Sequence, residues 1–267
     1  MHPYNVYDID EHVAELYDQQ ISDSADLAFI RGLIAQLAPA RSLQILEPFC
    51  GSGRLLLPLA QDGHCLAGLE QSHGMLARAR RKAAALPAEV QARITLLEQD
   101  VTRQSWPTGN DLVLLVGNCF YELGEPVQQE GLIRTALDAL KPGGWLLVDN
   151  DHMEGELPAN WLDPTPRPAF PSGLCADGAR LESTIQTVNH DPQRRVVCFR
   201  RTTRVTWPDG RAEVKERMQQ KHPLRMAEVR DWLEYHTFLL EAGWGDYSGA
   251  AFTPESPRAM FLARKRT

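Results

Sequence analysis

The stretch ILEPFCGSGR, residues 45–54, decides the fold prediction for this 267-residue chain. The apolar residues Leu43–Leu46 predict a buried strand, and residues Arg54–Ala60 predict a helix. Gly51 and Gly53 lie between the two, where the backbone must turn tightly and where a missing Cβ leaves room for a ligand. The helix also offers unpaired backbone N–H groups in its first turn. A plain tight turn would explain both glycines equally well, so the loop alone does not identify a ligand.

Two further observations narrow the kind of ligand. A dinucleotide-binding loop has the pattern G-x-G-x-x-G, and the third glycine would fall at position 56, which is Leu56. The next predicted strand, Cys65–Leu69, is followed by Glu70, whose carboxylate can accept both hydroxyls of a ribose. A glycine loop without a phosphate signature, followed by such an acid, favours a nucleoside that carries no phosphate.

Strands and helices alternate through the middle of the chain, which predicts a parallel sheet covered by helices on both faces. Two helices precede this pattern, at Asp10–Gln20 and from a cap at Ser22 or Ser24 to Leu37. The alternating elements are strands at 43–46, 65–69, 94–97, 111–116 and 145–148, and helices at 54–60, 72–86 and 127–140.

The pattern changes after residue 154. Prolines cluster between residues 155 and 178, which predicts a loop. Three segments with period-two alternation then predict antiparallel strands at 181–188, 196–207 and 211–219. A last helix is expected at Met226–Ala242, ending at Gly243, before strands near 244–247 and 260–263.

Composition limits the class of protein. The net charge of −7 repels phosphate backbones, so a nucleic-acid partner is not expected. No apolar run reaches the ~20 residues that span a bilayer, and the first residues do not resemble a signal peptide. With five cysteines and no CxxC pair, the sequence predicts a reduced, cytoplasmic protein. The basic run Arg78, Arg80, Arg81 and Lys82 is interpreted as a solvated helix end.

Four segments together resemble the class I S-adenosylmethionine-dependent methyltransferases: LEPFCGSGR, GLEQSHGMLARAR, EQDV and LKPGGWLLVDN, in order over about residues 43–150. Pro48-Phe49 departs from the smaller residues common in the family and should make the loop bulkier. The resemblance implies a cofactor site. Glu47, Gly51 and Gly53 would line the methionine end, Glu70 would hold the ribose, Gln71 and Met75 would flank the adenosine, Asp100 and Val101 would meet the adenine, and Gly117 and Asn118 would lie beside the sulfonium.

The resemblance also implies the architecture: an α/β, Rossmann-like class I methyltransferase fold. We expect a mostly parallel seven-stranded sheet with helices on both faces, plus a small antiparallel β insertion. Residues 1–42 would form a helical lid, 43–154 the cofactor-binding core, 155–222 the insertion over the acceptor site, and 223–267 the C-terminal part of the core. Leu16–Asp18 resembles a segment that folds over the cofactor, so Tyr17 is a candidate lid residue and Arg31 a candidate partner for the cofactor carboxylate. Core packing and a surface salt bridge are the respective alternatives.

The acceptor is harder to predict. Residues 117–121 lack the prolines of nucleic-acid amino-methyltransferases and are similar to the Gly-Asn-x-Phe run of glycine/sarcosine N-methyltransferases. Tyr121 is therefore a candidate to contact the acceptor, with ordinary packing as the alternative. His152 is a candidate base, or else a surface histidine. Asp149-Asn150 occupies a magnesium-binding position of catechol-type O-methyltransferases, but the second carboxylate is replaced by Gly117-Asn118, so no metal is expected.

The sequence thus predicts methyl transfer from S-adenosyl-L-methionine to a nitrogen or oxygen of a small molecule, with S-adenosyl-L-homocysteine as product and a setting in secondary metabolism. The chain would be a monomer or homodimer without nucleic-acid or membrane partners. The alternatives are a non-catalytic S-adenosylmethionine-binding protein and a nicotinamide-dependent oxidoreductase, against which Leu56 argues.

Overall fold

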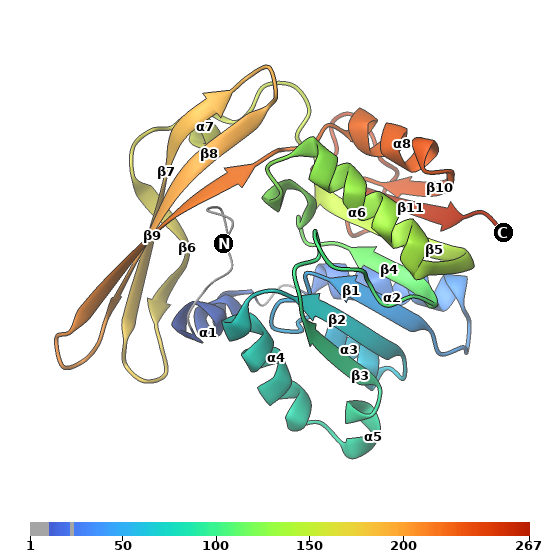
Figure 1. Cartoon of the computed structure of the whole chain (residues 1–267), viewed down its shortest axis with the longest axis horizontal. Helices are drawn as coiled ribbons and strands as arrows, with labels where there is room; N and C mark the ends of the chain where they lie inside the picture. The colour runs from blue at the N-terminus through green and yellow to red at the C-terminus, as the bar shows by residue number, and fades with distance from the viewer. Residues whose placement is uncertain (1–10, 22–23) are drawn as a thin grey trace.

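A seven-stranded sheet, sheet A, forms the centre of the molecule in the computed structural model, which describes residues 11–21 and 24–267 (Figure 1). Its strands lie in the order β10-β11-β5-β4-β1-β2-β3. The first five along the chain are parallel, and β11 is antiparallel to both of its neighbours. The expected mostly parallel sheet is confirmed. The strands are β1 (Gln44–Pro48), β2 (Cys65–Glu70), β3 (Ile94–Glu98), β4 (Asn110–Leu115), β5 (Leu140–Asp151), β10 (Phe238–Trp244) and β11 (Arg258–Lys265).

Helices cover both faces of sheet A because its central strand is apolar on both sides. Every residue of β4 is buried. Val113 and Leu115 pack in the cluster with α6 (Pro126–Ala139) and α8 (Met226–Tyr235), while Leu112 and Leu114 pack in the cluster with α2 (Ala25–Leu37) and α3 (Leu56–Gln61). The remaining helices are α1 (Glu11–Gln20), α4 (His73–Ala84), α5 (Ala88–Gln91), α7 (Ala159–Leu162) and the 3-10 helix η1 (Phe120–Glu122). The expected start at Asp10 and the possible cap Ser22 lie outside the described residues.

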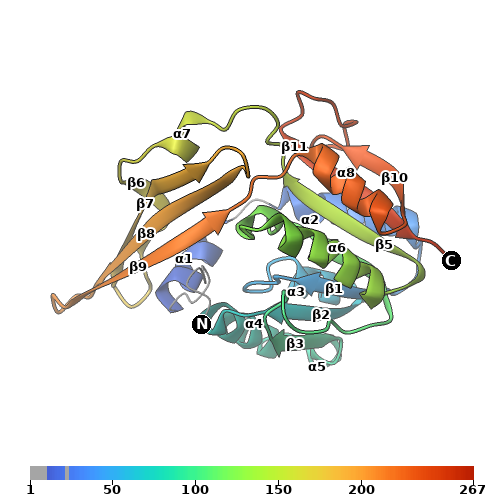
Figure 2. The same ribbon diagram turned by 45° about the horizontal axis from the view of Figure 1, so that its top comes forward.

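A second sheet, sheet B, stands beside sheet A (Figures 1 and 2). It contains four antiparallel strands in the order β6-β7-β8-β9: β6 (Arg167–Leu174), β7 (Arg180–Asp191), β8 (Val196–Thr206) and β9 (Ala212–Lys221). The predicted antiparallel insertion is confirmed, but the prediction of a proline-rich loop was wrong over β6. This strand lies at the edge of sheet B and changes register between Ala169 and Gly173, so it tolerates Pro168 and Pro171, which a central strand would exclude.

The expected long C-terminal helix was also wrong. α8 ends at Tyr235, and Thr237 has φ of 61°, a left-handed conformation that interrupts the helix. The apolar residues after it form β10, which pairs with β11 at the edge of sheet A. Gly243 therefore lies in a strand and does not cap a helix. Helical periodicity was outweighed here by pairing with a strand that comes later in the chain.

In the part of the chain that the structure describes, no helix combines the length and the apolar character needed to cross a membrane.

Candidate cofactor and acceptor site

The glycine loop leaves β1 through three left-handed residues, Phe49, Gly51 and Gly53, with φ of 61°, 55° and 79°. The backbone N–H groups of both glycines are already used. The N–H of Gly51 donates to Glu70 Oε2 at 3.0 Å, and that of Gly53 donates to the Cys50 carbonyl at 2.9 Å. A phosphate would need these donors. The loop is therefore not arranged to hold a pyrophosphate, in agreement with the absence of a third glycine.

Glu70, at the end of the neighbouring strand β2, is hydrogen-bonded to the glycine loop. Its two carboxylate oxygens accept from the N–H groups of Gly51 and Ser72, the latter at 2.7 Å. Burial raises the pKa of Glu70, although backbone hydrogen bonds from Ser72, Gly51 and Gln71 act in the opposite direction. A carboxylate has about four acceptor positions, so a position remains for a ligand hydroxyl beside the three backbone donors. The structure thus brings Glu70 to the glycine loop, as the sequence predicted.

Glu47, at the end of β1, is a buried acid with an unsatisfied oxygen. The residue is 5% exposed, and its Oε2 has no hydrogen-bond partner among the described residues. Burial, helped by the charges of Asp26 and Glu70, raises the pKa of Glu47 to about 8, although Arg54 and the Leu56 N–H act to lower it. An unpaired buried acceptor is costly, so this oxygen indicates a ligand that donates a hydrogen bond.

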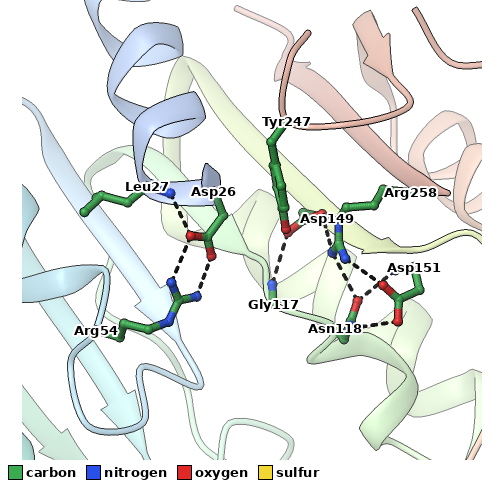
Figure 3. Close-up of polar contacts among 9 residues, drawn as sticks. All are labelled: Asp26, Leu27, Arg54, Gly117, Asn118, Asp149, Asp151, Tyr247 and Arg258. Carbon is green, nitrogen blue, oxygen red and sulfur yellow. Dashed lines mark hydrogen bonds and ion pairs between the residues drawn. The ribbon is translucent and has the colours of Figure 1, made fainter. Parts of the chain in front are cut away.

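Arg54 begins the segment after the glycine loop and faces Asp26 at the start of α2 (Figure 3). Two guanidinium nitrogens donate to the two oxygens of Asp26, Nη1 to Oδ1 at 2.8 Å. These hydrogen bonds raise the pKa of Arg54, so the side chain is cationic throughout the accessible pH range. The buried part of the site therefore holds a fixed cation beside the unsatisfied oxygen of Glu47.

Helix α1 is fastened over the glycine loop by charged side chains. Asp18 accepts hydrogen bonds from Ser52 Oγ, from Arg78 and from Lys82, the last at 3.0 Å. Arg81 pairs with Glu11 at 2.7 Å. The interpretation of this basic run as a solvated helix end holds for Arg80 and Arg81, which are 49% and 55% exposed, but was wrong for Arg78 and Lys82, which hold Asp18 of α1.

Tyr17 lies on the same helix and reaches the site. Its hydroxyl is hydrogen-bonded to Arg54, Glu47 lies close enough to affect its pKa, and burial raises that pKa. The ring packs edge-on against Phe170 of β6, with centroids 5.7 Å apart. The structure thus places Tyr17 between the glycine loop and sheet B.

Arg31 does not lie at the site, which corrects the sequence prediction. Its guanidinium pairs with Asp62 at 2.6 and 3.0 Å on the surface. Asp62 follows the C-terminal end of α3 and precedes β2, so it lies at the amino ends of the strands, whereas the glycine loop lies at their carboxyl ends. The surface salt bridge, weighed as the alternative, is what the structure shows.

The expected adenosine contacts lie at the ends of β2 and β3, which are hydrogen-bonded neighbours. Met75 is buried in the first turn of α4, where Ser72 caps the helix, and Gln71 is half-buried beside it. Asp100 accepts hydrogen bonds from the N–H and hydroxyl of Thr102, at 2.9 and 2.6 Å. Val101 is buried. The four residues predicted to contact adenosine, namely Gln71, Met75, Asp100 and Val101, thus share one edge of the sheet with Glu70, although Asp100 also shapes its own turn.

Gly117 and Asn118 form a left-handed turn after β4, with φ of 69° and 65°. The N–H of Gly117 donates to Asp149 Oδ2 and that of Asn118 to the Asp149 carbonyl, both at 3.3 Å (Figure 3). Both backbone donors of the turn therefore point toward β5. Gly117 itself is exposed. Because both N–H groups of the turn are used, its free backbone atoms are carbonyl oxygens, which attract a cation better than an anion.

Asp149 is held by residues from the C-terminal part of the chain. Arg258 donates to its Oδ1 through Nε at 2.9 Å and Nη2 at 2.6 Å, and Tyr247 donates its hydroxyl to Oδ2 at 2.9 Å. Burial raises the pKa of Asp149 and of Tyr247. With a guanidinium against this carboxylate, a divalent cation would meet charge repulsion there. Among residues 11–21 and 24–267, no group of three His, Cys, Asp or Glu side chains is arranged to hold a metal.

Tyr121 and His152 are the two catalytic candidates. Tyr121 lies in η1, but its side chain lies outside the described part of the structure. His152 follows β5, and its side chain is only 4% exposed, so the surface alternative was wrong. Its Nδ1 pairs with the Ser256 carbonyl at 2.8 Å, while the buried Nε2 has no hydrogen-bond partner among the described residues. A carbonyl can only accept, so Nδ1 carries the proton in the neutral ring and Nε2 holds the lone pair of a base.

Sequence reasoning missed Asp26, Arg54, Tyr247 and Arg258. The position of Arg54 directly after Gly53 in the motif could have indicated that it lies at the site. Nothing in the sequence could have indicated Arg258, since 140 residues separate it from Asn118, to which it is hydrogen-bonded.

Comparison with known proteins finds similarity to methyltransferases. Residues 45–144 match the model of the methyltransferase domain. Over 96% of this chain and 99% of its own length, a protein of Geobacillus sp. (strain WCH70) named as a methyltransferase is 22% identical. The family model thus matches the stretch in which the sequence resembles class I S-adenosylmethionine-dependent methyltransferases. The methyltransferase match argues against the nicotinamide-dependent alternative.

Solved structures show the same fold along nearly the whole chain. An S-adenosylmethionine-dependent methyltransferase of Clostridium acetobutylicum superposes with a TM-score of 0.74 at 13% identity, covering 95% of this chain and 96% of its own. A sugar N-methyltransferase of Streptoalloteichus sp. superposes with a TM-score of 0.71 at 17% identity, covering 94% and 91%. The antiparallel insertion is therefore included in the shared fold.

Proposed function

We propose that the chain transfers the methyl group of S-adenosylmethionine to a nitrogen or oxygen of a small molecule in secondary metabolism. Nitrogen is preferred because of the Gly117-Asn118-Cys119-Phe120 run, and the likeness to a sugar N-methyltransferase supports that preference. The observation that carries the proposal is the unsatisfied Oε2 of Glu47 beside the cation of Arg54.

The residues at the carboxyl edge of sheet A fit this cofactor. The methionine end of the cofactor carries an ammonium, which Glu47 Oε2 can accept, and a carboxylate, which the guanidinium of Arg54 can bind. Gly51 and Gly53 would line this end, and Glu70 would hold the ribose hydroxyls. Gln71, Met75, Asp100 and Val101 would border the adenine, and Gly117 and Asn118 the sulfur.

When bound, S-adenosylmethionine supplies a methyl group on a positively charged sulfur, which is already reactive. The chain must therefore align the two partners and exclude water, and good alignment can lower the barrier by roughly 7–11 kcal/mol. Tyr17 and α1 lie over the glycine loop and shield it from solvent. His152 Nε2 is the group proposed to take the acceptor's proton, a contribution of about 10²–10⁴ in rate. Tyr121 is proposed to hydrogen-bond the acceptor.

Calorimetry with S-adenosylhomocysteine tests the cofactor assignment, because this product analogue needs no acceptor. We expect saturable binding at one site per chain. Labelled S-adenosylmethionine is then incubated with the enzyme and a metabolite extract, and mass spectrometry identifies the methylated compound. Absence of binding would remove the proposal. Tight binding without transfer to any metabolite would favour the non-catalytic alternative.

A cytoplasmic location and a monomeric or homodimeric state belong to the same proposal, and light scattering of the purified protein measures the second.

A further inference from the structure

Arg258 joins four side chains from three parts of the fold: β5, the turn after β4 and the segment that contains Tyr247. Its guanidinium donates to Asp149, to Asp151 Oδ1 at 2.6 Å and to Asn118 Oδ1 at 3.2 Å. It also lies over the Tyr247 ring, with Cζ 4.9 Å from the centroid (Figure 3). The side chain is 17% exposed. A planar group with five donors can bridge these acceptors, whereas a lysine ammonium could not reach all of them together.

The side chain of Asn118 is fixed by the same cluster. Its Nδ2 donates to Asp151 Oδ2 at 3.0 Å, and its Oδ1 accepts from the backbone N–H of Asp151 at 2.7 Å. Both ends of this amide are thus used within the protein. Asn118 therefore acts as a brace between β4 and β5, and the turn presents its backbone to the site.

The turn needs such a brace. Gly117 and Asn118 are consecutive left-handed residues, a backbone conformation that glycine and asparagine adopt more readily than other residues and that the surrounding contacts must hold in place. Asp149, 2% exposed, and Asp151 project from the same face of one strand, so two carboxylates would repel each other without a cation. Arg258 offsets both charges and also contacts Asn118 directly.

We infer that Arg258 is a positioning residue, which holds the Gly117–Asn118 turn in the shape that receives the sulfur end of the cofactor. This inference rests on the proposed function, in which the turn borders the reacting methyl group. Arg258 acts through Asp149 and Asn118 and does not touch the cofactor itself.

The test compares Arg258→Ala with Arg264→Ala. Arg264 lies on the same face of β11 but at its other end, where it donates to the Gly143 carbonyl at 3.1 Å and stacks on Trp145. Hydrogen exchange measures the turn through the N–H groups of Gly117 and Asn118, and calorimetry measures affinity for S-adenosylhomocysteine. For Arg258→Ala we expect about tenfold faster exchange and about tenfold weaker binding, which corresponds to about 1.4 kcal/mol. Arg264→Ala should leave both unchanged.

Chemical rescue separates positioning from general destabilisation. Guanidinium ion at millimolar concentration should restore most of the affinity lost in Arg258→Ala, because it can occupy the vacated position. Arg258→Lys, which keeps the charge, should bind with intermediate affinity and covers the case that the alanine variant does not fold. Unchanged exchange and affinity in Arg258→Ala, an equal loss in Arg264→Ala, or no rescue by guanidinium would each overturn the inference. Failure of the wild-type protein to bind S-adenosylhomocysteine would instead refute the proposed function, and the exchange experiment would still report on Arg258.

Discussion

Binding of the cofactor should release a proton from Glu47. In the free protein the pKa of this buried carboxyl is about 8, so most molecules carry a proton on Glu47 at pH 7. An ammonium donating to Oε2 favours the charged form and lowers this pKa. Affinity for S-adenosylhomocysteine should therefore rise with pH by up to about tenfold per unit between pH 6 and 8, and level off above.

Glu47→Gln provides the matched change, because it keeps the shape and removes the ionisation. Loss of a charge-assisted hydrogen bond of about 1.5–3 kcal/mol predicts roughly 10- to 150-fold weaker binding at pH 8. The variant should also lose the pH dependence. The assay is calorimetry in two buffers with different ionisation enthalpies, which counts the protons released on binding.

Although Glu47→Gln should weaken cofactor binding, it should increase the stability of the cofactor-free protein. Since the folded pKa of Glu47 lies above its unfolded value near 4.5, its favourable contribution is complete below pH 4.5 and is lost as pH rises through 8. A pKa difference of this size amounts to roughly 3–5 kcal/mol. Glu47→Gln should therefore stabilise the cofactor-free protein at pH 8, measured by urea unfolding. Wild-type affinity that stays flat from pH 6 to 8, or a glutamine variant with the same slope, would refute the reasoning.

Three further outcomes follow from the geometry. Glu70→Ala removes the acceptor proposed for the ribose hydroxyls and should weaken S-adenosylhomocysteine binding by at least about tenfold; unchanged affinity in calorimetry would exclude this role. Arg54→Met should weaken the same binding to a similar degree, whereas Arg31→Met, which changes a surface pair, should not; equal effects would contradict the placement of both arginines. Gly68→Ala would place a Cβ 2.5 Å from Leu56 Cδ1 and 2.7 Å from Cys50 Sγ, so we expect a loss of about 1–3 kcal/mol in urea unfolding. Gly32→Ala, where no atom lies within 4 Å of the new Cβ, should instead gain about 0.5–1 kcal/mol as a helix-interior control, and the reverse order would refute the packing argument.

The parallel half of sheet A could be predicted because its signals are local. Continuous apolar runs mark strands buried on both faces, and β4 is the clearest of them. Gly51 and Gly53 mark the turn out of β1, and Glu70 marks the end of β2. Each of these features depends on residues a few positions apart, where the backbone geometry itself imposes the pattern.

Other elements could not be predicted because their partners are distant in the chain. The edge strand β6 contains prolines that normally indicate a loop, and only its pairing with β7 makes it a strand. The residues of β10 have a helical pattern, but β11 stabilises them as a strand. From the sequence, Arg78 and Lys82 of α4 look solvent-exposed, because nothing in the sequence indicates that they pair with Asp18 of α1.

The sequence by itself determined the α/β fold and the placement of the residues on its glycine loop and second strand, because short-range backbone geometry determines where these residues lie. Only the tertiary structure decided which charges neutralise one another: Arg54 with Asp26, Asp18 with the cations of α4, and Arg258 with Asp149. Electrostatic pairing depends on distance in space, and distance along the chain does not predict it.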